Sequence, residues 1–180
     1  IGRGAWIGIG LGVVAVALVA GIDVRVSGRA LFGDAIALVG EFEPSLAGSE
    51  LAKLRGIPAA GPLPPMKASA VRDAHKAVRD GIQSEALHNA HDVSEGGLVV
   101  ALAECCIAGG LGAAVELPEG IDPFAEAPGR AFIVSGAPEA LAGFRVIGRV
   151  GGDDLEIAGQ LKIAVSALRD AYEAGLAQVL

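Results

Sequence analysis

Residues 91–98 read His-Asp-Val-Ser-Glu-Gly-Gly-Leu, and this stretch gathers polar side chains in a chain that is otherwise largely apolar. The apolar residues that follow it recur at helical spacing, so residues 92–97 are predicted to form a loop that opens directly into a helix. Another helix is predicted upstream of the loop. The rest of the chain is therefore interpreted as a scaffold around this loop.

The loop has the chemistry of an anion or metal site. Asp92 or Ser94 would cap backbone N–H groups of the first helical turn, and Gly96 and Gly97 would leave others exposed. The helix dipole favours negative charge at the same end. A phosphate group, or Mg²⁺ bound to phosphate, is therefore the predicted ligand.

Composition limits the possible classes of protein. The chain has 180 residues, of which 52% are hydrophobic and 19% charged, so one domain with a sizeable core is expected over residues 1–180. Its net charge of −7, without a basic cluster, argues against a nucleic-acid partner. The two cysteines, Cys105 and Cys106, are neighbours on a predicted helix and are expected to be small buried residues rather than a disulfide or zinc ligands.

Helices and strands are predicted to mix along the chain, which indicates one sheet with helices packed on it. Strands are expected at 35–39, 113–117 and 131–135, and at 146–150 and 155–157 as a hairpin about the Gly-Gly-Asp-Asp turn. Helices are expected from about 66 to 88, from the loop to Gly109-Gly110, over 137–143, and from about 166 onward. Residues 4–22 carry no charge; five glycines and β-branched residues there favour buried strands over a membrane span or a signal peptide.

Three polar residues each have a structural and a functional interpretation. Ser49 is interpreted first as the N-cap of a short helix ending at Gly56, and second as a ligand contact. Asp92 is either a helix cap or a Mg²⁺ ligand, and local preference alone favours the cap. His91 is expected to position the loop by hydrogen bonding, since no nucleophile or acidic partner is evident beside it.

Several motifs together carry a resemblance. The loop motif is followed by Ala-Leu-Ala-Glu at 101–104 and Gly-Gly-Leu-Gly-Ala at 109–113, and a Gly-Asp turn at 33–34 precedes Val-Gly-Glu at 39–41. Ala-Gly-Ser-Glu follows at 47–50, where Ala47 stands in place of the glycine that is usual in the family that these motifs resemble. This set resembles the C-terminal repeat of formylglycinamide ribonucleotide amidotransferase, the phosphoribosylformylglycinamidine synthase of de novo purine synthesis, in the aminoimidazole ribonucleotide synthetase-like superfamily.

The resemblance implies an α/β (α+β) fold of the aminoimidazole ribonucleotide synthetase C-terminal-domain type, with a single mixed β-sheet flanked by helices. The chain is expected to be a C-terminal fragment of a longer synthetase. By the same resemblance the longer motif favours Asp92 as the Mg²⁺ ligand, and no catalytic residue is assigned. The residues that it implies for contact with ATP or ADP are Ser94, Gly96, Gly97 and Ser49.

The reaction implied is ATP-dependent activation of the amide oxygen of formylglycinamide ribonucleotide, after which ammonia from glutamine displaces phosphate to give the amidine. The sequence contains no glutaminase Cys-His pair and no Gly-rich ATP loop. The implied partners are therefore the N-terminal domains of the same synthetase and a glutaminase subunit or domain. The isolated chain is predicted to be inactive, and its location is expected to be cytoplasmic, with no nucleic acid and no membrane.

Three alternatives remain open at this stage. The chain could be a domain of another superfamily member, such as selenophosphate synthetase, thiamine-monophosphate kinase or a hydrogenase-maturation protein. It could also be a non-catalytic module whose loop holds a structural nucleotide. The third alternative is a membrane-anchored domain that uses residues 4–22.

Overall fold

The computed structural model describes residues 30–42, 46–57 and 65–177, so the expectations for residues 4–22 lie outside the described part. The strands are β1 (Ala35–Gly40), β2 (Leu87–Asp92), β3 (Ala113–Val115), β4 (Ala131–Gly136), β5 (Arg145–Val150), β6 (Asp154–Ile157) and β7 (Leu161–Ala164). The helices are α2 (Glu50–Leu54), α3 (Ala68–Gln83), α4 (Gly97–Gly109) and α5 (Val165–Ala177).

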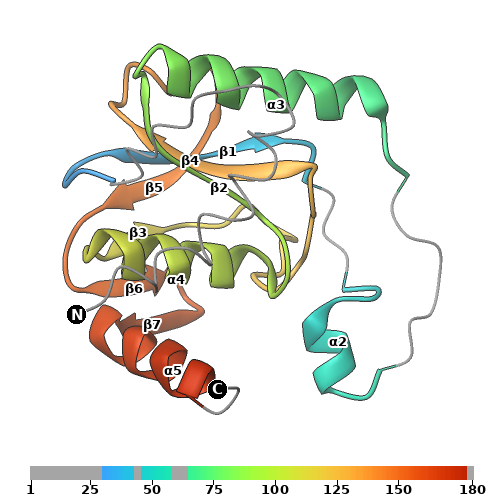
Figure 1. Cartoon of the computed structure of the whole chain (residues 1–180), viewed down its shortest axis with the longest axis vertical. Coiled ribbons are helices and arrows are strands. Elements are labelled where there is room, and N and C mark those ends of the chain that lie inside the picture. Colours follow the sequence, from blue (N-terminus) through green and yellow to red (C-terminus); the bar gives the residue numbers. More distant parts are fainter. Residues whose placement is uncertain (1–29, 43–45, 58–64, 178–180) are drawn as a thin grey trace.

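The seven strands of the described residues form one sheet in the order β2-β4-β1-β5-β3-β6-β7 (Figure 1). Neighbouring strands are antiparallel except β3 and β6, which are parallel. The predicted fold class, a single mixed β-sheet flanked by helices, is confirmed.

The centre of the sheet is covered on both faces. On β1, Ile36 and Leu38 belong to the core cluster that contains residues of α4, whereas Ala37 and Val39 belong to the cluster that contains Ala74 of α3. A strand buried on both faces is a continuous apolar run rather than an alternating one, which explains the sequence of β1. The sheet is therefore the middle layer between two hydrophobic cores.

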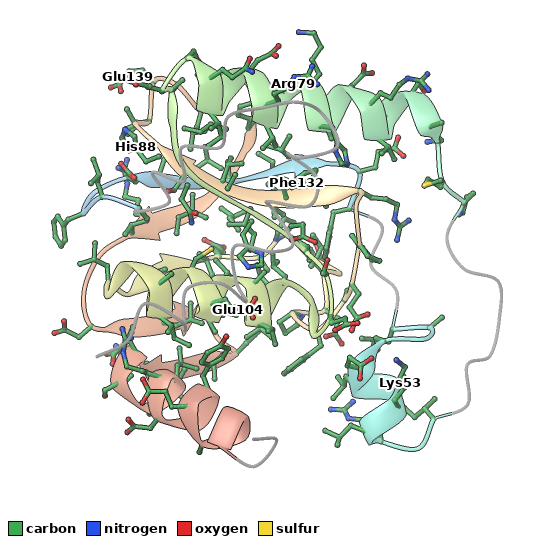
Figure 2. The ribbon with its side chains drawn as sticks, viewed as in Figure 1. Lys53, Arg79, His88, Glu104, Phe132 and Glu139 are labelled. Atoms are coloured by element: carbon green, nitrogen blue, oxygen red, sulfur yellow. The ribbon has the colours of Figure 1, made fainter. Side chains whose placement is uncertain are left out.

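The two helical layers differ in character. α3 is amphipathic and covers β1, β2 and β4. The ring of its His75 meets the ring of Phe132 on β4 edge-on, with centroids 5.0 Å apart. Figure 2 labels Phe132 in the sheet below α3. α4 lies on the opposite face, where Leu98 and Leu102 are fully buried. α5 packs against α4, and its Arg169 Nη2 donates to the carbonyl oxygen of Ile107 at 2.7 Å. No residue of α4 is fully exposed, and eight of its thirteen residues are buried, so α4 is a core helix.

The helix predicted over 66–88 is too long. α3 ends at Gln83, and Glu85 adopts a positive φ of 60° before β2 begins at Leu87. A Cβ added to Gly81 would lie 2.6 Å from the Leu87 side chain, so the helix and the strand pack closely where they meet. Pairing with β4 makes residues 87–92 a strand, which local helical periodicity did not reveal.

The hairpin predicted about residues 151–154 is also wrong. β3 lies between β5 and β6, so these two strands do not pair with each other. Gly112 at the start of this inserted strand donates its N–H to Gly152 O at 2.7 Å and accepts from Gly151 N at 2.8 Å. The hairpin lies one connection later, between β6 and β7, with Gly159 at φ 71° in its turn.

A third correction concerns residues 137–143, where a helix was predicted. Residues 138–143 form consecutive turns, with hydrogen bonds from Ala140 N to Ala137 O and from Phe144 N to Leu141 O, both 2.9 Å. Leu141 is fully buried in the core beneath α3. The segment therefore buries Leu141 and forms its backbone hydrogen bonds through tight turns, without a helix.

Candidate functional site

Residues 93–96 connect the end of β2 to the start of α4, so the predicted loop opens into a helix as expected, but it is shorter than the predicted 92–97 and follows a strand. Asp92 is the last residue of β2, so its side chain leaves from the edge strand of the sheet. The helix predicted upstream ends at Gln83, and β2 lies between it and the loop. The loop therefore joins a sheet strand to a core helix, which anchors both of its ends.

Neither Asp92 nor Ser94 caps the helix. The N-cap of α4 is Gly96, with φ 80° and no side-chain cap hydrogen bond. The hydroxyl of Ser94 instead donates to Oδ2 of Asp92. The capping interpretation of Asp92 is therefore wrong, and this carboxylate is free of the helix end and oriented by Ser94.

The glycines do not expose N–H groups in the way that was predicted. Gly96 N donates to the Glu126 carboxylate at 2.9 Å, Gly97 N donates to Ser94 O at 3.1 Å, and Val99 N donates to Pro123 O at 2.8 Å. Three backbone donors at the start of α4 thus already have partners within the chain. Gly97 is needed for another reason, since a Cβ there would lie 2.4 Å from the carbonyl carbon of Phe124.

His91 has an acidic partner that local sequence did not reveal. Its Nδ1 hydrogen-bonds the carbonyl oxygen of Asp92 at 2.7 Å, and its Nε2 lies 3.1 Å from Oε2 of Glu104 on α4 (Figure 2 labels Glu104). Burial lowers the pKa of His91, but the bond to Glu104, the Asp92 carbonyl and the neighbouring charges outweigh it and raise the pKa overall. When the ring is protonated, both of its nitrogens donate, one to the Asp92 carbonyl oxygen at the end of β2 and the other to Glu104.

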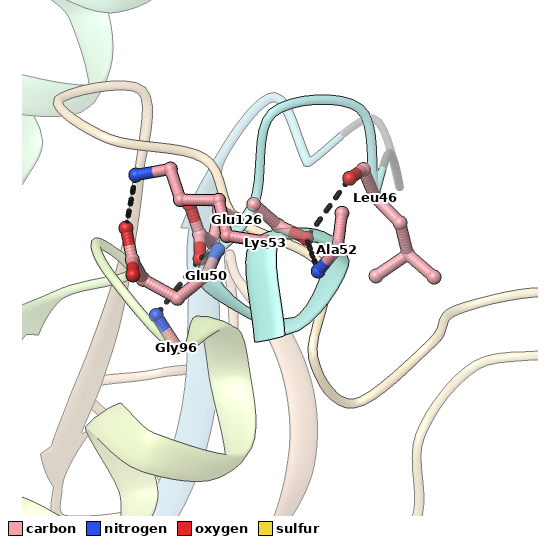
Figure 3. Close-up of polar contacts among 7 residues, drawn as sticks. Leu46, Glu50, Ala52, Lys53, Gly96 and Glu126 are labelled. Carbon is pink, nitrogen blue, oxygen red and sulfur yellow. Dashed lines mark hydrogen bonds and ion pairs between the residues drawn. The ribbon is translucent and has the colours of Figure 1, made fainter. Parts of the chain in front are cut away.

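Glu126 links the loop to α2. Its Oε1 accepts from Gly96 N at 2.9 Å and from Glu50 N at 2.8 Å (Figure 3). The pKa of Lys53 is raised by its hydrogen bond and charge interaction with Glu50, and further by the charges of Glu95 and Glu126. Four charged side chains from three segments therefore gather beside the loop.

Ser49 lies in the same region but is turned inward. It is buried, its hydroxyl donates to Leu46 O at 2.9 Å, and the same oxygen accepts from Ala52 N at 3.2 Å. This is the N-cap of a short helix, the first of the two interpretations drawn from the sequence. α2 itself ends at Leu54, and Arg55 follows as its C-cap.

The cysteines near the loop are poor nucleophiles. Burial raises the pKa of the Cys105 thiol to about 12 and that of Cys106 to about 11. Asn89 Nδ2 also donates to Cys105 Sγ at 3.2 Å. Both thiols stay protonated at neutral pH. Cys106 is buried as predicted, whereas Cys105 is only partly buried.

Asp92 is the Mg²⁺ ligand predicted at the loop. No group of three or more His, Cys, Asp or Glu side chains arranged to hold a metal occurs among the described residues. Asp92 has a side chain 27% exposed, with Oδ2 bonded to Ser94 and Oδ1 3.7 Å from His91 Nδ1. A single carboxylate fits Mg²⁺ that is otherwise held by phosphates and water, which is its usual mode with nucleotides.

Membrane crossing finds no support in the described part of the chain, where no helix combines the necessary length with sufficient apolar character.

The fold and the loop define an α/β domain in which an acidic, glycine-rich turn connects the edge strand β2 to the start of the buried helix α4. Residues 32–162 match the family described as AIR synthase related protein, C-terminal domain. The chain belongs to that family.

Individual relatives share one description. The chain is 37% identical over 155 residues to the phosphoribosylformylglycinamidine synthase subunit PurL of Methanosarcina mazei, covering 78% of this chain and 22% of the relative. In structure it is similar to T. maritima PurL complexed with FGAR, with a TM-score of 0.62 at 16% identity over 79% of this chain and 29% of that one. T. maritima PurL complexed with ATP gives a TM-score of 0.54 at 14% identity, with 79% and 26% covered. The chain thus spans about a fifth of the length of the curated relative.

Proposed function

We propose that this chain is the C-terminal domain of a phosphoribosylformylglycinamidine synthase and that its 92–97 loop forms one lobe of a magnesium–nucleotide site. The observation that carries the proposal is the loop itself. It presents the partly exposed carboxylate of Asp92, not used as a helix cap, in a chain 37% identical to a PurL subunit. The name of that relative and the ATP and FGAR complexes of its structural neighbour support the same assignment.

In this proposal Asp92 ligates Mg²⁺ and Ser94 contacts the nucleotide. The proton of the Ser94 hydroxyl is committed to Asp92, so its oxygen offers lone pairs to the ligand. Lone pairs suit a ribose hydroxyl or a Mg²⁺-bound water better than a phosphate oxygen, which can only accept. The protonated form of His91, which its raised pKa favours, places a positive charge beside the Asp92 carboxylate, and its ring hydrogen-bonds the Asp92 carbonyl oxygen at the end of β2.

Gly96, Gly97 and Ser49 take less direct roles. The two glycines let the backbone fold tightly, because both have positive φ and Gly97 approaches the backbone of Phe124. Ser49 fixes the start of α2 from inside, which sets where that helix lies beside the loop. These three residues therefore shape the nucleotide lobe through the backbone.

For the whole synthetase, we propose the ATP-dependent conversion of formylglycinamide ribonucleotide and glutamine-derived ammonia to formylglycinamidine ribonucleotide. The phosphoryl group activates the amide oxygen, ammonia forms the new C–N bond, and phosphate leaves with that oxygen. The preceding domains would complete the nucleotide site, and a glutaminase subunit or domain would supply the ammonia. The 180-residue chain alone is then inactive, because it holds one lobe of the site.

Calorimetric titration of ADP with Mg²⁺ tests the proposal, using the chain alone and the chain joined to the preceding segment of its gene. Asp92→Asn keeps the shape of the side chain and removes its charge, while Asp73→Asn makes the same change on an exposed position of α3. We expect the longer chain to bind Mg²⁺–ADP. Asp92→Asn should weaken this binding by at least roughly 10- to 100-fold, the loss of affinity that removal of an outer-shell metal partner causes. Asp73→Asn should leave the affinity unchanged.

Two outcomes would contradict the proposal. If Asp92→Asn binds Mg²⁺–ADP as well as the unsubstituted protein, Asp92 is not the metal ligand. If the 180-residue chain alone binds as tightly as the longer chain, the site is complete without preceding domains and the one-lobe arrangement is wrong.

A further inference from the structure

Glu126 stands out among the charged residues because one oxygen atom joins two segments that are far apart in the sequence. Oε1 accepts from Gly96 N, the N-cap of α4, and from Glu50 N, the first residue of α2 (Figure 3). We propose that Glu126 is a positioning residue, whose carboxylate holds α2 and the 92–97 loop in the single arrangement that nucleotide binding requires. The binding part of this inference rests on the proposed function; the structural part does not.

The carboxylate is aimed by the backbone on either side of it. Ala127 N donates to Val93 O at 2.9 Å, and Pro123 O accepts from Val99 N at 2.8 Å, so residues 123–127 lie along the loop from its first residue into α4. The Glu126 side chain therefore starts from a fixed position. Removing it leaves these backbone bonds in place, which means that a variant should keep the fold and lose the link to α2.

Charge makes the link stronger than an ordinary pair of hydrogen bonds. Backbone N–H groups that donate to an ionised carboxylate form bonds about twice as strong as neutral ones. The acidic side chain of Glu50 pairs with Lys53, which reduces its repulsion of Glu126. Lys53 in turn feels the charges of Glu95 and Glu126, so the cation lies within reach of all the acidic groups around the link.

Figure 1 shows why the link matters for α2. This helix lies to one side of the sheet, away from α3, α4 and α5, and Ala52 is its buried residue. The Glu126 bond to Glu50 N connects it to the loop at a defined distance. If α2 contributes to the nucleotide lobe, its contribution depends on that connection.

An opposite reading of the same contact makes an opposite prediction. A carboxylate bound to Gly96 N could occupy the place of a ligand phosphate, in which case removing it would make Mg²⁺–ADP bind more tightly. Loss of a positioning residue would instead weaken Mg²⁺–ADP binding, because the loop and α2 could then separate. The direction of the change in affinity therefore decides between them.

Backbone amide exchange measured by NMR on the 180-residue chain tests the link without any ligand. Glu126→Ala removes the acceptor, Glu126→Gln keeps an amide oxygen at the same reach, and Glu119→Ala is the matched control in the same connection at an exposed position. We expect Glu126→Ala to speed exchange at Gly96 and Glu50 about tenfold, with partial rescue by Glu126→Gln and no change in Glu119→Ala. Unchanged exchange at both amides in Glu126→Ala would overturn the inference.

The longer chain of the preceding experiment then tests the binding part. Glu126→Ala should weaken Mg²⁺–ADP binding, and Glu126→Gln should restore part of it; tighter binding by Glu126→Ala overturns the positioning role. Absence of binding by the unsubstituted longer chain overturns the proposed function together with the binding part. The amide exchange result is independent of that outcome, so the two failures can be told apart.

Discussion

Gly97 offers the sharpest test of how the loop is built. Its φ is +75°, and a Cβ at this position would lie 2.4 Å from the carbonyl carbon of Phe124, 2.6 Å from its oxygen and 2.7 Å from the oxygen of Ala125. These are backbone atoms of a segment that is itself hydrogen-bonded to the loop and to α4. The neighbour therefore cannot give way by a simple side-chain rotation, and Gly97→Ala should strain both segments.

The expected cost has two parts. A non-glycine residue in the left-handed region costs about 1–2 kcal/mol. Forcing a methyl group into a closely packed site costs about 1–3 kcal/mol more, because the surrounding backbone must shift. Gly97→Ala should thus lower the free energy of unfolding by about 2–5 kcal/mol, a large part of the roughly 5–15 kcal/mol that stabilises a typical domain.

Gly110 provides a matched control at the other end of the same helix. Its φ is +67°, but a Cβ there would meet nothing within 4 Å. Gly110→Ala should therefore show the conformational part alone, about 1–2 kcal/mol. Urea denaturation of the two variants and the unsubstituted chain, followed by circular dichroism, measures the difference.

The decisive quantity is the difference in the free energy of unfolding between Gly97→Ala and Gly110→Ala. If Gly97→Ala and Gly110→Ala unfold at the same urea concentration with the same slope, the close approach of Phe124 has no energetic weight. The description of the 92–97 loop as shaped by residues 123–127 would then be wrong. If Gly97→Ala is the less stable variant, the 92–97 loop and residues 123–127 form one structural unit.

Two further substitutions test the elements that surround the loop. The pKa of His91 is raised above its ordinary 6.5, so the stability that its protonation contributes is complete below pH 6.5 and is lost as the pH rises through the pKa of the folded state. Urea unfolding at a series of pH values measures the stability difference between the unsubstituted chain and His91→Gln. This difference should shrink as the pH rises. A difference that grows with pH would show that the imidazolium is not the stabilising form. Arg169→Met removes the bond to Ile107 O and should cost about 1–2 kcal/mol, or about 2–8 °C in Tm at the roughly 2–4 °C per kcal/mol expected for a domain of this size. Arg72→Met, at an exposed position of α3, should leave Tm within 1 °C or so of the unsubstituted chain by comparison with other surface substitutions.

Much of the fold followed from local patterns. The apolar run at residues 35–39 became β1, and the Gly109-Gly110 pair ended α4, with Gly110 in the left-handed conformation. Such features depend on periodicity and on the conformational freedom of glycine, both of which are properties of a short segment. The loop that opens into a helix was predicted for the same reason.

Strand pairing was harder to predict. The helix predicted from the sequence extended to about residue 88, yet residues 87–92 form β2, because they pair with the edge of β4. β3 enters between β5 and β6, although the turn between those two strands resembles a hairpin. Which edges remain open depends on the packing of the whole sheet, so no short segment carries that information.

The candidate site divides along the same line. The sequence alone determined that an acidic, glycine-rich turn at residues 92–97 precedes a helix, because residue type and spacing are enough to specify it. Only the tertiary structure placed Glu104 against His91 and brought Glu126 to both Gly96 and Glu50. These contacts join residues distant along the chain, and their geometry exists only after the sheet and its helices have packed. Tertiary packing therefore decided which donors of the loop are already satisfied, and it left the Asp92 carboxylate bonded to Ser94 rather than to the start of the helix.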